Sequence, residues 1–318
     1  MAVEANTTGG WSLPSSRESW IVRAFRRNVT GYMFLSLWLI GFFGLTLGPA
    51  LASLYLSFTD YDLLTPPQWS GLKNYEYALF HDQRLWHSLS VTFNYVLWGV
   101  PLRLAVALGL AIILDRSVRG VAFYRAAFYL PSLLGASVAI AVMWRQLFGA
   151  DGLINSLLFV VTGIQGPSWV SNPNYALWTL VALTIWQFGS PMIIFLAGLR
   201  QIPQDLYEAA SMDGASGWRQ FRKITLPLLA PVIFFNLVLQ TIEAFKAFTQ
   251  AYIVSGGLGG PVNSTLFYTL NLYLEAFANF RMGYASTLAW ILLVIIGIFT
   301  TLAFWTSKYW VYYEDESR

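Results

Sequence analysis

Five polar residues interrupt one long apolar stretch in the last third of the chain: Asn236, Gln240, Glu243, Lys246 and Gln250. If the stretch is a single helix, about 100° per residue places them all within an arc of about 120°. Amide, carboxylate and ammonium groups on one face supply the donors and acceptors that bind a hydroxyl-rich solute. A carboxylate inside a membrane helix can equally carry a proton or a cation.

Two interpretations of this stripe stay open. In the structural one, Glu243 and Lys246 neutralise each other at a spacing of three residues, and neighbouring helices take up the other hydrogen bonds. In the functional one, Asn236, Gln240, Glu243 and Lys246 bind substrate, with the two amides deeper in the path. Lys246 can then pair with an anionic group on the solute. Arg103, the other charge within an apolar stretch, is expected to brace helices more often than to touch substrate.

Other kinds of chemistry lack the residues they need. The chain has no cysteine and only two histidines, His81 and His87, so no catalytic centre and no metal site are predicted. It also lacks the glycine-rich phosphate loop that binds ATP, so any ATP must be hydrolysed by another polypeptide. The weaker candidates for lining a path are Asn94, Tyr95, Trp186 and Gln187.

The composition is that of an integral membrane protein. Of 318 residues, 56% are hydrophobic and 11% are charged, whereas soluble domains carry about 25% charged residues. The formal net charge is only +3, and no nucleic-acid partner is expected.

Six apolar segments are long enough to cross a bilayer, which needs about 20 residues. They run over residues 31–58, 88–114, 126–144, 175–199, 226–254 and 283–307. Of the 19 Lys and Arg residues, 13 fall on the side of both termini and four on the opposite side. The positive-inside rule therefore places both termini in the cytoplasm.

The rest of the chain is divided accordingly. Residues 1–30 and 314–318 are expected to be cytoplasmic tails of a membrane domain over residues 31–313. Residues 60–87 are expected to form an external cap, and residues 153–161 a helix too short to cross the membrane. The expected kink points within spans are Gly189, Pro191, Pro227 and Pro231.

The loop over residues 200–225 predicts a short exposed helix. Pro203 suits its first turn, Leu206 and Ala209 share a face, and Gly214 ends it. A basic amphipathic piece follows, and resting on anionic lipid headgroups would explain its charges. Contact with lipid would not explain why the short helix before it has a small, nearly uncharged face that projects to where a partner protein can bind it.

In this loop the run Glu208-Ala209-Ala210, with Gly214, Ile224 and Leu226-Pro227 at their spacings, resembles the EAA motif of ATP-binding-cassette importer permeases. In that family the loop forms a coupling helix that docks on a cytoplasmic ATPase. The resemblance implies that Glu208, Ala209, Ala210, Asp213 and Gly214 dock there, with Ile224, Leu226 and Pro227 completing the motif.

The resemblance covers most of the chain. The segments 71–75, 130–131 and 256–261 are similar to those of the carbohydrate-importer branch of the family. The glycine-rich segment at 256–261 is longer than usual, and there are six spans rather than the eight of the maltose-type subunit. The implied fold is an all-helical type I importer permease in a bacterial inner membrane. The resemblance implies that the protein is not an enzyme and that it forms half of the path through which a carbohydrate crosses the membrane.

The implied partners are an ATPase dimer that holds ATP and magnesium, a second and different permease subunit, an extracytoplasmic binding protein and membrane lipid. The chain itself is expected to hold no cofactor. An ion-coupled secondary transporter that uses Glu243 is the alternative.

Overall fold

The computed structural model describes residues 29–115, 120–135 and 137–311. Apart from residues 29 and 30, the expected terminal tails lie outside these ranges. The chain divides into two compact units, with the boundary between Ser53 and Leu54.

The first unit is helical in its described part. It contains α2 (Val29–Gly41), a π-helical turn (Phe42–Leu47) and the start of α3 (Gly48–Ser57). The continuous stretch Gly31–Ser57 is 27 residues long and apolar, which is enough to cross a bilayer. Large side chains such as Leu37 (76% exposed) cover its surface, as suits a helix surrounded by acyl chains.

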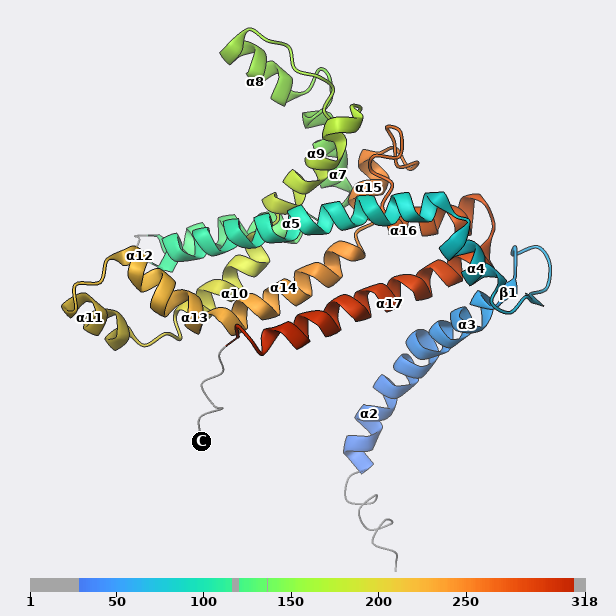
Figure 1. Ribbon diagram of the computed structural model, residues 1–318, viewed down its shortest axis with the longest axis horizontal. Coiled ribbons are helices and arrows are strands. Elements are labelled where there is room, and N and C mark those ends of the chain that lie inside the picture. Colours follow the sequence, from blue (N-terminus) through green and yellow to red (C-terminus); the bar gives the residue numbers. More distant parts are fainter. Residues whose placement is uncertain (1–28, 116–119, 136, 312–318) are drawn as a thin grey trace, which may run out of the picture. The chain divides into compact units, whose positions relative to one another are not determined.

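The second unit carries the remaining elements, in the order β1 (Thr59–Asp60), β2 (Gln68–Trp69), α4 (Lys73–Phe80), α5 (Gln83–Asp115), α6 (Val121–Leu134), α7 (Val138–Leu147), α8 (Leu153–Thr162), α9 (Pro173–Trp186), α10 (Gly189–Leu199), α11 (Gln204–Met212), α12 (Gly217–Gln220), a π-helical turn (Phe221–Thr225), α13 (Leu226–Leu228), α14 (Ala230–Phe245), α15 (Thr249–Val254), α16 (Tyr268–Tyr273), a π-helical turn (Leu274–Ala278) and α17 (Met282–Ser307). The long helix α5 packs against α9, α10, α14 and α16 (Figure 1).

Among the described residues, three helices are individually long and apolar enough to span a membrane: Gly31–Ser57, α5 and α17. Three helix pairs, bent by 96°, 42° and 64°, bring the total to as many as six. The expected spans over 126–144, 175–199 and 226–254 are thus each built from more than one helix. The first two are interrupted, and in the third α14 ends at Phe245 with a separate helix after it.

The breaks have local causes. Ser137 accepts a hydrogen bond from the backbone N–H of Ile140 and starts α7 afresh. Pro191 lies within the first turn of α10, where its missing N–H is tolerated. The close approach of α10 to α6 requires Gly189, because a Cβ there would lie 2.8 Å from the Cα of Tyr129.

A small two-stranded sheet and α4 form one end of the second unit, which is called the outer end after the orientation that the basic residues predict. β1 and β2 are antiparallel, with Thr59 opposite Trp69. In the turn between them, the Asp62 carboxylate accepts hydrogen bonds from the Thr65 backbone N–H and hydroxyl. These bonds lower the pKa of the Asp62 carboxyl.

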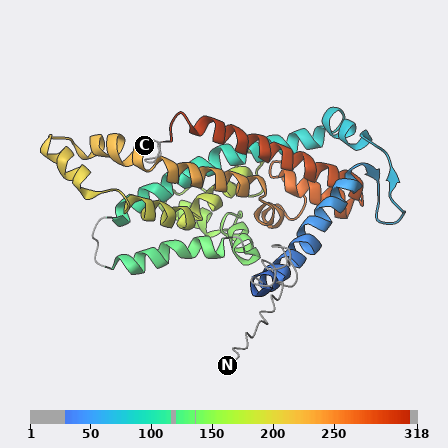
Figure 2. The same cartoon turned by 90° about the horizontal axis from the view of Figure 1, so that it is seen from below.

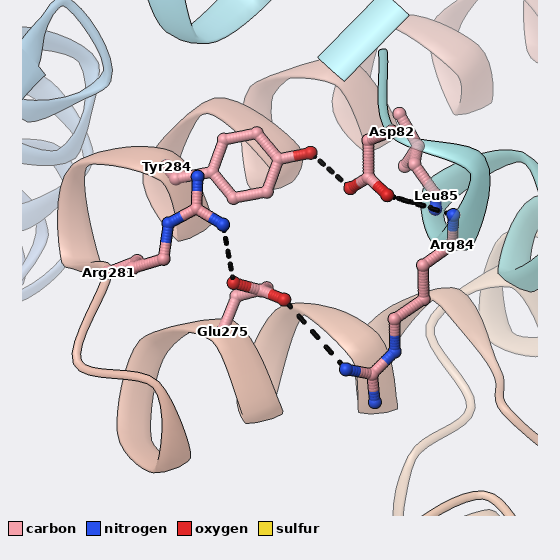
Figure 3. Close-up of polar contacts among 6 residues, drawn as sticks. All are labelled: Asp82, Arg84, Leu85, Glu275, Arg281 and Tyr284. Carbon is pink, nitrogen blue, oxygen red and sulfur yellow. Dashed lines mark hydrogen bonds and ion pairs between the residues drawn. The ribbon is translucent and has the colours of Figure 1, made fainter. Parts of the chain in front are cut away.

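A cluster of two buried carboxylates and two partly exposed arginines joins three segments at the outer end (Figure 3). Asp82 caps α5 by accepting from the backbone N–H groups of Arg84 (2.8 Å) and Leu85 (3.1 Å), and it also accepts from the Tyr284 hydroxyl of α17. Glu275 lies 3.3 Å from Arg281 and 4.0 Å from Arg84. Because both carboxylates are nearly buried and fully paired, the cluster fixes the ends of α5 and α17 to each other.

Candidate functional site

A polar pocket of about 420 Å³ lies between helices of the second unit. It is bounded by α5, the α9–α10 break, α14 and α15. The lining residues are Tyr95, Val100, Arg103, Thr184, Gln187, Ser190, Gln240, Glu243, Ala244, Lys246, Ala247, Phe248, Thr249 and Gln250. Its volume is in the range of small-molecule sites.

Three of the four predicted substrate-binding residues line this pocket: Gln240, Glu243 and Lys246. The Lys246 Nζ lies 2.7 Å from Glu243 Oε1, so the ion pair of the structural interpretation is present. The same two side chains remain 51% and 66% exposed. The pair is therefore formed and accessible at once, and the two interpretations do not exclude each other.

Asn236 is not brought to the pocket. Its side chain is fully buried, and its Nδ2 donates to the Val232 carbonyl (3.1 Å). The single continuous stripe is also wrong beyond Phe245, because Lys246 ends α14 and Gln250 belongs to α15. The turn between the helices still leaves Gln250 in the pocket wall.

The strongest polar group that the stripe did not include is Arg103 of α5. Its Nε and Nη2 donate to the Gln187 carbonyl at 2.9 and 2.6 Å. The bracing role expected for it is thus observed, yet it also lines the pocket. Thr184 and Ser190 of the wall had no signal in the sequence, since single hydroxyls are common in membrane helices.

The electrostatics of the pocket follow from its three charged residues. Arg103 and Lys246 contribute two positive charges and Glu243 one negative charge. The balance favours a negatively charged or strongly polar occupant. Phe248 adds an aromatic surface, since it packs against Tyr252 and Tyr273 with ring centroids 5.4 and 5.1 Å away.

Metal chemistry has no support in the part of the chain that the structure describes. No group of three or more His, Asp or Glu side chains gathers there in a way that could hold an ion.

The predicted coupling loop contains the short helix α11, which lies at the end opposite the short strands (Figure 2). This end is called the inner end, again after the orientation that the basic residues predict. Gly214 ends it with a φ of +72°, and the Ala215 N–H donates to the Ala210 carbonyl (2.9 Å) while the Gly214 N–H donates to Ser211 (3.0 Å). This pattern is a Schellman motif, which requires a left-handed residue and so favours glycine. The residues from Glu208 to Gly214 therefore correspond to a helix, α11, that ends at a defined glycine.

The loop is hydrogen-bonded to the segment that follows it, and most of its motif residues are exposed. The Tyr207 hydroxyl pairs with Thr225 (2.8 Å), and Gln220 donates to Ser211 (2.9 Å). The exposed motif residues are Glu208, Ala209, Asp213, Gly214, Leu226 and Pro227, whereas Ala210 and Ile224 are half-buried. The structure thus presents α11 as an exposed surface that two hydrogen bonds tie to the segment after it.

Comparison with known proteins places these features among transport components. Residues 83–310 match the family model described as binding-protein-dependent transport system inner membrane component. The chain is 56% identical to "Probable ABC transporter permease protein YesP" of Bacillus subtilis (strain 168), covering 93% of this chain and 96% of that protein. It is 31% identical to "Probable starch degradation products transport system permease protein AmyD" of Thermoanaerobacterium thermosulfurigenes, covering 89% and 96%.

A solved structure shares the fold. A chain of the bacterial alginate ABC transporter in complex with an alginate pentasaccharide-bound periplasmic protein superposes with a TM-score of 0.78. The match covers 91% of this chain and 97% of that chain at 18% identity. The likeness shows a common architecture for the helices described above.

Proposed function

The chain belongs to the family of binding-protein-dependent transport system inner membrane components, and from this premise we propose that it forms half of the path by which a carbohydrate is imported. The observation that carries the proposal is the polar, aromatic-edged pocket at the level of the helix breaks. The starch-degradation relative agrees with a carbohydrate solute.

The pocket chemistry favours a carbohydrate that carries a negative charge. Lys246 and Glu243 form an accessible pair, and a solute carboxylate or phosphate can share the ammonium while sugar hydroxyls hydrogen-bond to Gln240 and Gln250. Phe248 provides an apolar face against which a sugar ring can pack. Because Arg103 adds a second positive charge, an anion gains more from this site than a neutral sugar does.

The energy for transport comes from partners. The exposed face of α11 fits docking on an ATPase subunit, with Glu208, Ala209, Ala210, Asp213 and Gly214 at the contact and Ile224, Leu226 and Pro227 holding the loop behind it. The other partners are a second permease subunit and an extracytoplasmic solute-binding protein, in a bacterial inner membrane.

The experiment that tests the proposal is the ATPase activity of the purified complex with its binding protein. Matched pairs of neutral sugars and their uronate or phosphate derivatives are added one at a time. We expect stimulation by one carbohydrate class, and stronger stimulation by its anionic member. Absence of a co-purifying ATPase subunit, together with uptake by the isolated chain in an ion gradient, would instead establish an ion-coupled transporter that uses Glu243.

A further inference from the structure

Three helix breaks of the second unit meet at five residues, which are called the break cluster here: Arg103, Ser132, Gly135, Gln187 and Gln250. Gly135 lies between α6 and α7, Gln187 lies between α9 and α10, and Gln250 follows the break between α14 and α15. Arg103 comes from α5, which is unbroken. The cluster thus joins the interrupted helices to the one long helix of the core.

The centre of the cluster is the backbone carbonyl of Gln187. In a continuous helix this carbonyl would accept from the N–H four residues later, but that residue is Pro191, which has none. Arg103 Nε (2.9 Å), Arg103 Nη2 (2.6 Å) and Ser132 Oγ (2.8 Å) donate to it instead. Two other helices therefore supply the donor that proline removed.

A second carbonyl extends the connection. α6 ends at Leu134 and α7 begins at Val138, which leaves the Gly135 carbonyl free of the helix. Gln187 Nε2 donates to it at 3.0 Å and Gln250 Nε2 at 3.3 Å. A Cβ at Gly135 would lie only 2.7 Å from that Gln187 nitrogen, so a larger residue would push the amide away.

We propose that Arg103 is a positioning residue for solute binding: by supplying the donors that Pro191 lacks, it holds the three breaks at one level and so sets the shape of the polar pocket. Arg103, Gln187 and Gln250 are members of the pocket wall as well as of the cluster. A guanidinium is suited to this role because its planar fork can place two N–H groups on one oxygen, which an ammonium does not reproduce. The inference relies on the proposed function only for the nature of the solute.

The test uses a reporter cysteine, for which the cysteine-free chain offers a clean background. Thr249→Cys, in the pocket wall, is introduced into the assembled complex and its modification by a cationic methanethiosulfonate is timed on this chain. We expect Arg103→Met to change the modification rate by about tenfold, as loss of a part-buried charge-assisted hydrogen bond implies. Arg103→Lys is expected to remain close to Arg103→Met.

The decisive comparison is a double-mutant cycle with Pro191→Ala. Alanine restores an N–H that can reach the Gln187 carbonyl, so Arg103→Met should matter much less in that background. Gly135→Ala should alter the rate by displacing Gln187. Gly109→Ala, on α5 with nothing within 4 Å of the added methyl group, is the matched control and should leave the rate unchanged.

The outcomes separate the alternatives. Equal effects of Arg103→Met in both backgrounds, or a wild-type rate in Arg103→Lys, would overturn the positioning role and leave Arg103 as a counter-charge alone. If Arg103→Met does not assemble, Ser132→Ala removes one donor from the same carbonyl and is expected to shift the rate in the same direction. Since labelling needs no solute, failure here leaves the carbohydrate proposal standing, and the reverse also holds.

Discussion

At the scale of single residues, the pocket shows how a charged group becomes tolerable inside a membrane protein. Lys246 and Glu243 neutralise each other, with Nζ and Oε1 2.7 Å apart, while more than half of each side chain remains exposed. Arg103 is satisfied by a carbonyl rather than by a carboxylate. Residual positive charge is therefore available to a solute without leaving any of the three groups unpaired.

This arrangement predicts opposite effects from removing its two exposed charges. Lys246→Met should lower the affinity for an anionic sugar by about tenfold to a hundredfold, because the lost attraction is of the order of 1–3 kcal/mol in a partly hydrated site. Glu243→Gln should raise that affinity. The apparent solute constants of stimulated ATPase activity measure both. The control is Lys308→Met, which lies directly after the last residue of α17. Equal losses of affinity for neutral and anionic sugars after Lys246→Met would contradict the electrostatic role.

At the scale of secondary-structure elements, the candidate sites are formed by the ends and interruptions of helices rather than by their interiors. α11 ends where its sequence demands, at a glycine with positive φ. The breaks of the core helices occur where proline or a capping serine leaves carbonyls free, and these carbonyls are then taken up by other helices.

The stop of α11 makes a specific prediction. Gly214→Ala should weaken coupling between solute and ATPase, because alanine at φ +72° costs about 1 kcal/mol and so unwinds the last turn. Gly217→Ala is the matched control, since it is equally open, with nothing within 4 Å, and has no positive φ. The ratio of stimulated to basal ATPase activity should fall only in the first variant, with the thermal midpoint of the complex unchanged in both.

The outer cluster makes a prediction about stability. Asp82→Ala removes the cap of α5 and leaves the Tyr284 hydroxyl without its acceptor, which should cost about 2–4 kcal/mol. Thermal unfolding of the purified protein in detergent should show a clearly lower midpoint. Glu76→Ala, on the exposed side of neighbouring α4, should not. Similar midpoints for both variants would mean that the cluster adds no net stability.

At the scale of the whole molecule, the second unit separates its tasks along its length. The charge cluster of Asp82 and Glu275 lies at the end that carries the short strands, the pocket lies at the helix breaks, and α11 lies at the opposite end (Figure 2). The helix α5, 33 residues long, runs along this length and contributes Tyr95, Val100 and Arg103 to the pocket wall.

The distribution of basic residues predicts how this length is oriented in the membrane. Phe80→Cys, at a position 76% exposed, should react with a membrane-impermeant maleimide in intact spheroplasts. Tyr309→Cys, at a position 72% exposed, should react only after the membrane is opened. Each variant is its own control before and after permeabilisation, and the reverse pattern would mean that the positive-inside assignment is wrong.

The sequence by itself determined the membrane class, the fold class, the apolar segments and the coupling-loop motif. These are local properties: hydrophobic length, charge placement and a glycine at a helix end are all visible within a few neighbouring residues. The comparisons confirmed the family and the helical permease fold.

Only the tertiary structure decided which polar residues meet. Arg103 and Gln187 are 84 positions apart, and Gln250 and Gly135 are 115 apart. A freed carbonyl takes its donor from whichever helix packs against it, and neither hydropathy nor periodicity specifies that partner. For the same reason the stripe extrapolated along one ideal helix included the buried Asn236 and omitted Arg103, because the pocket is formed between helices rather than on one of them.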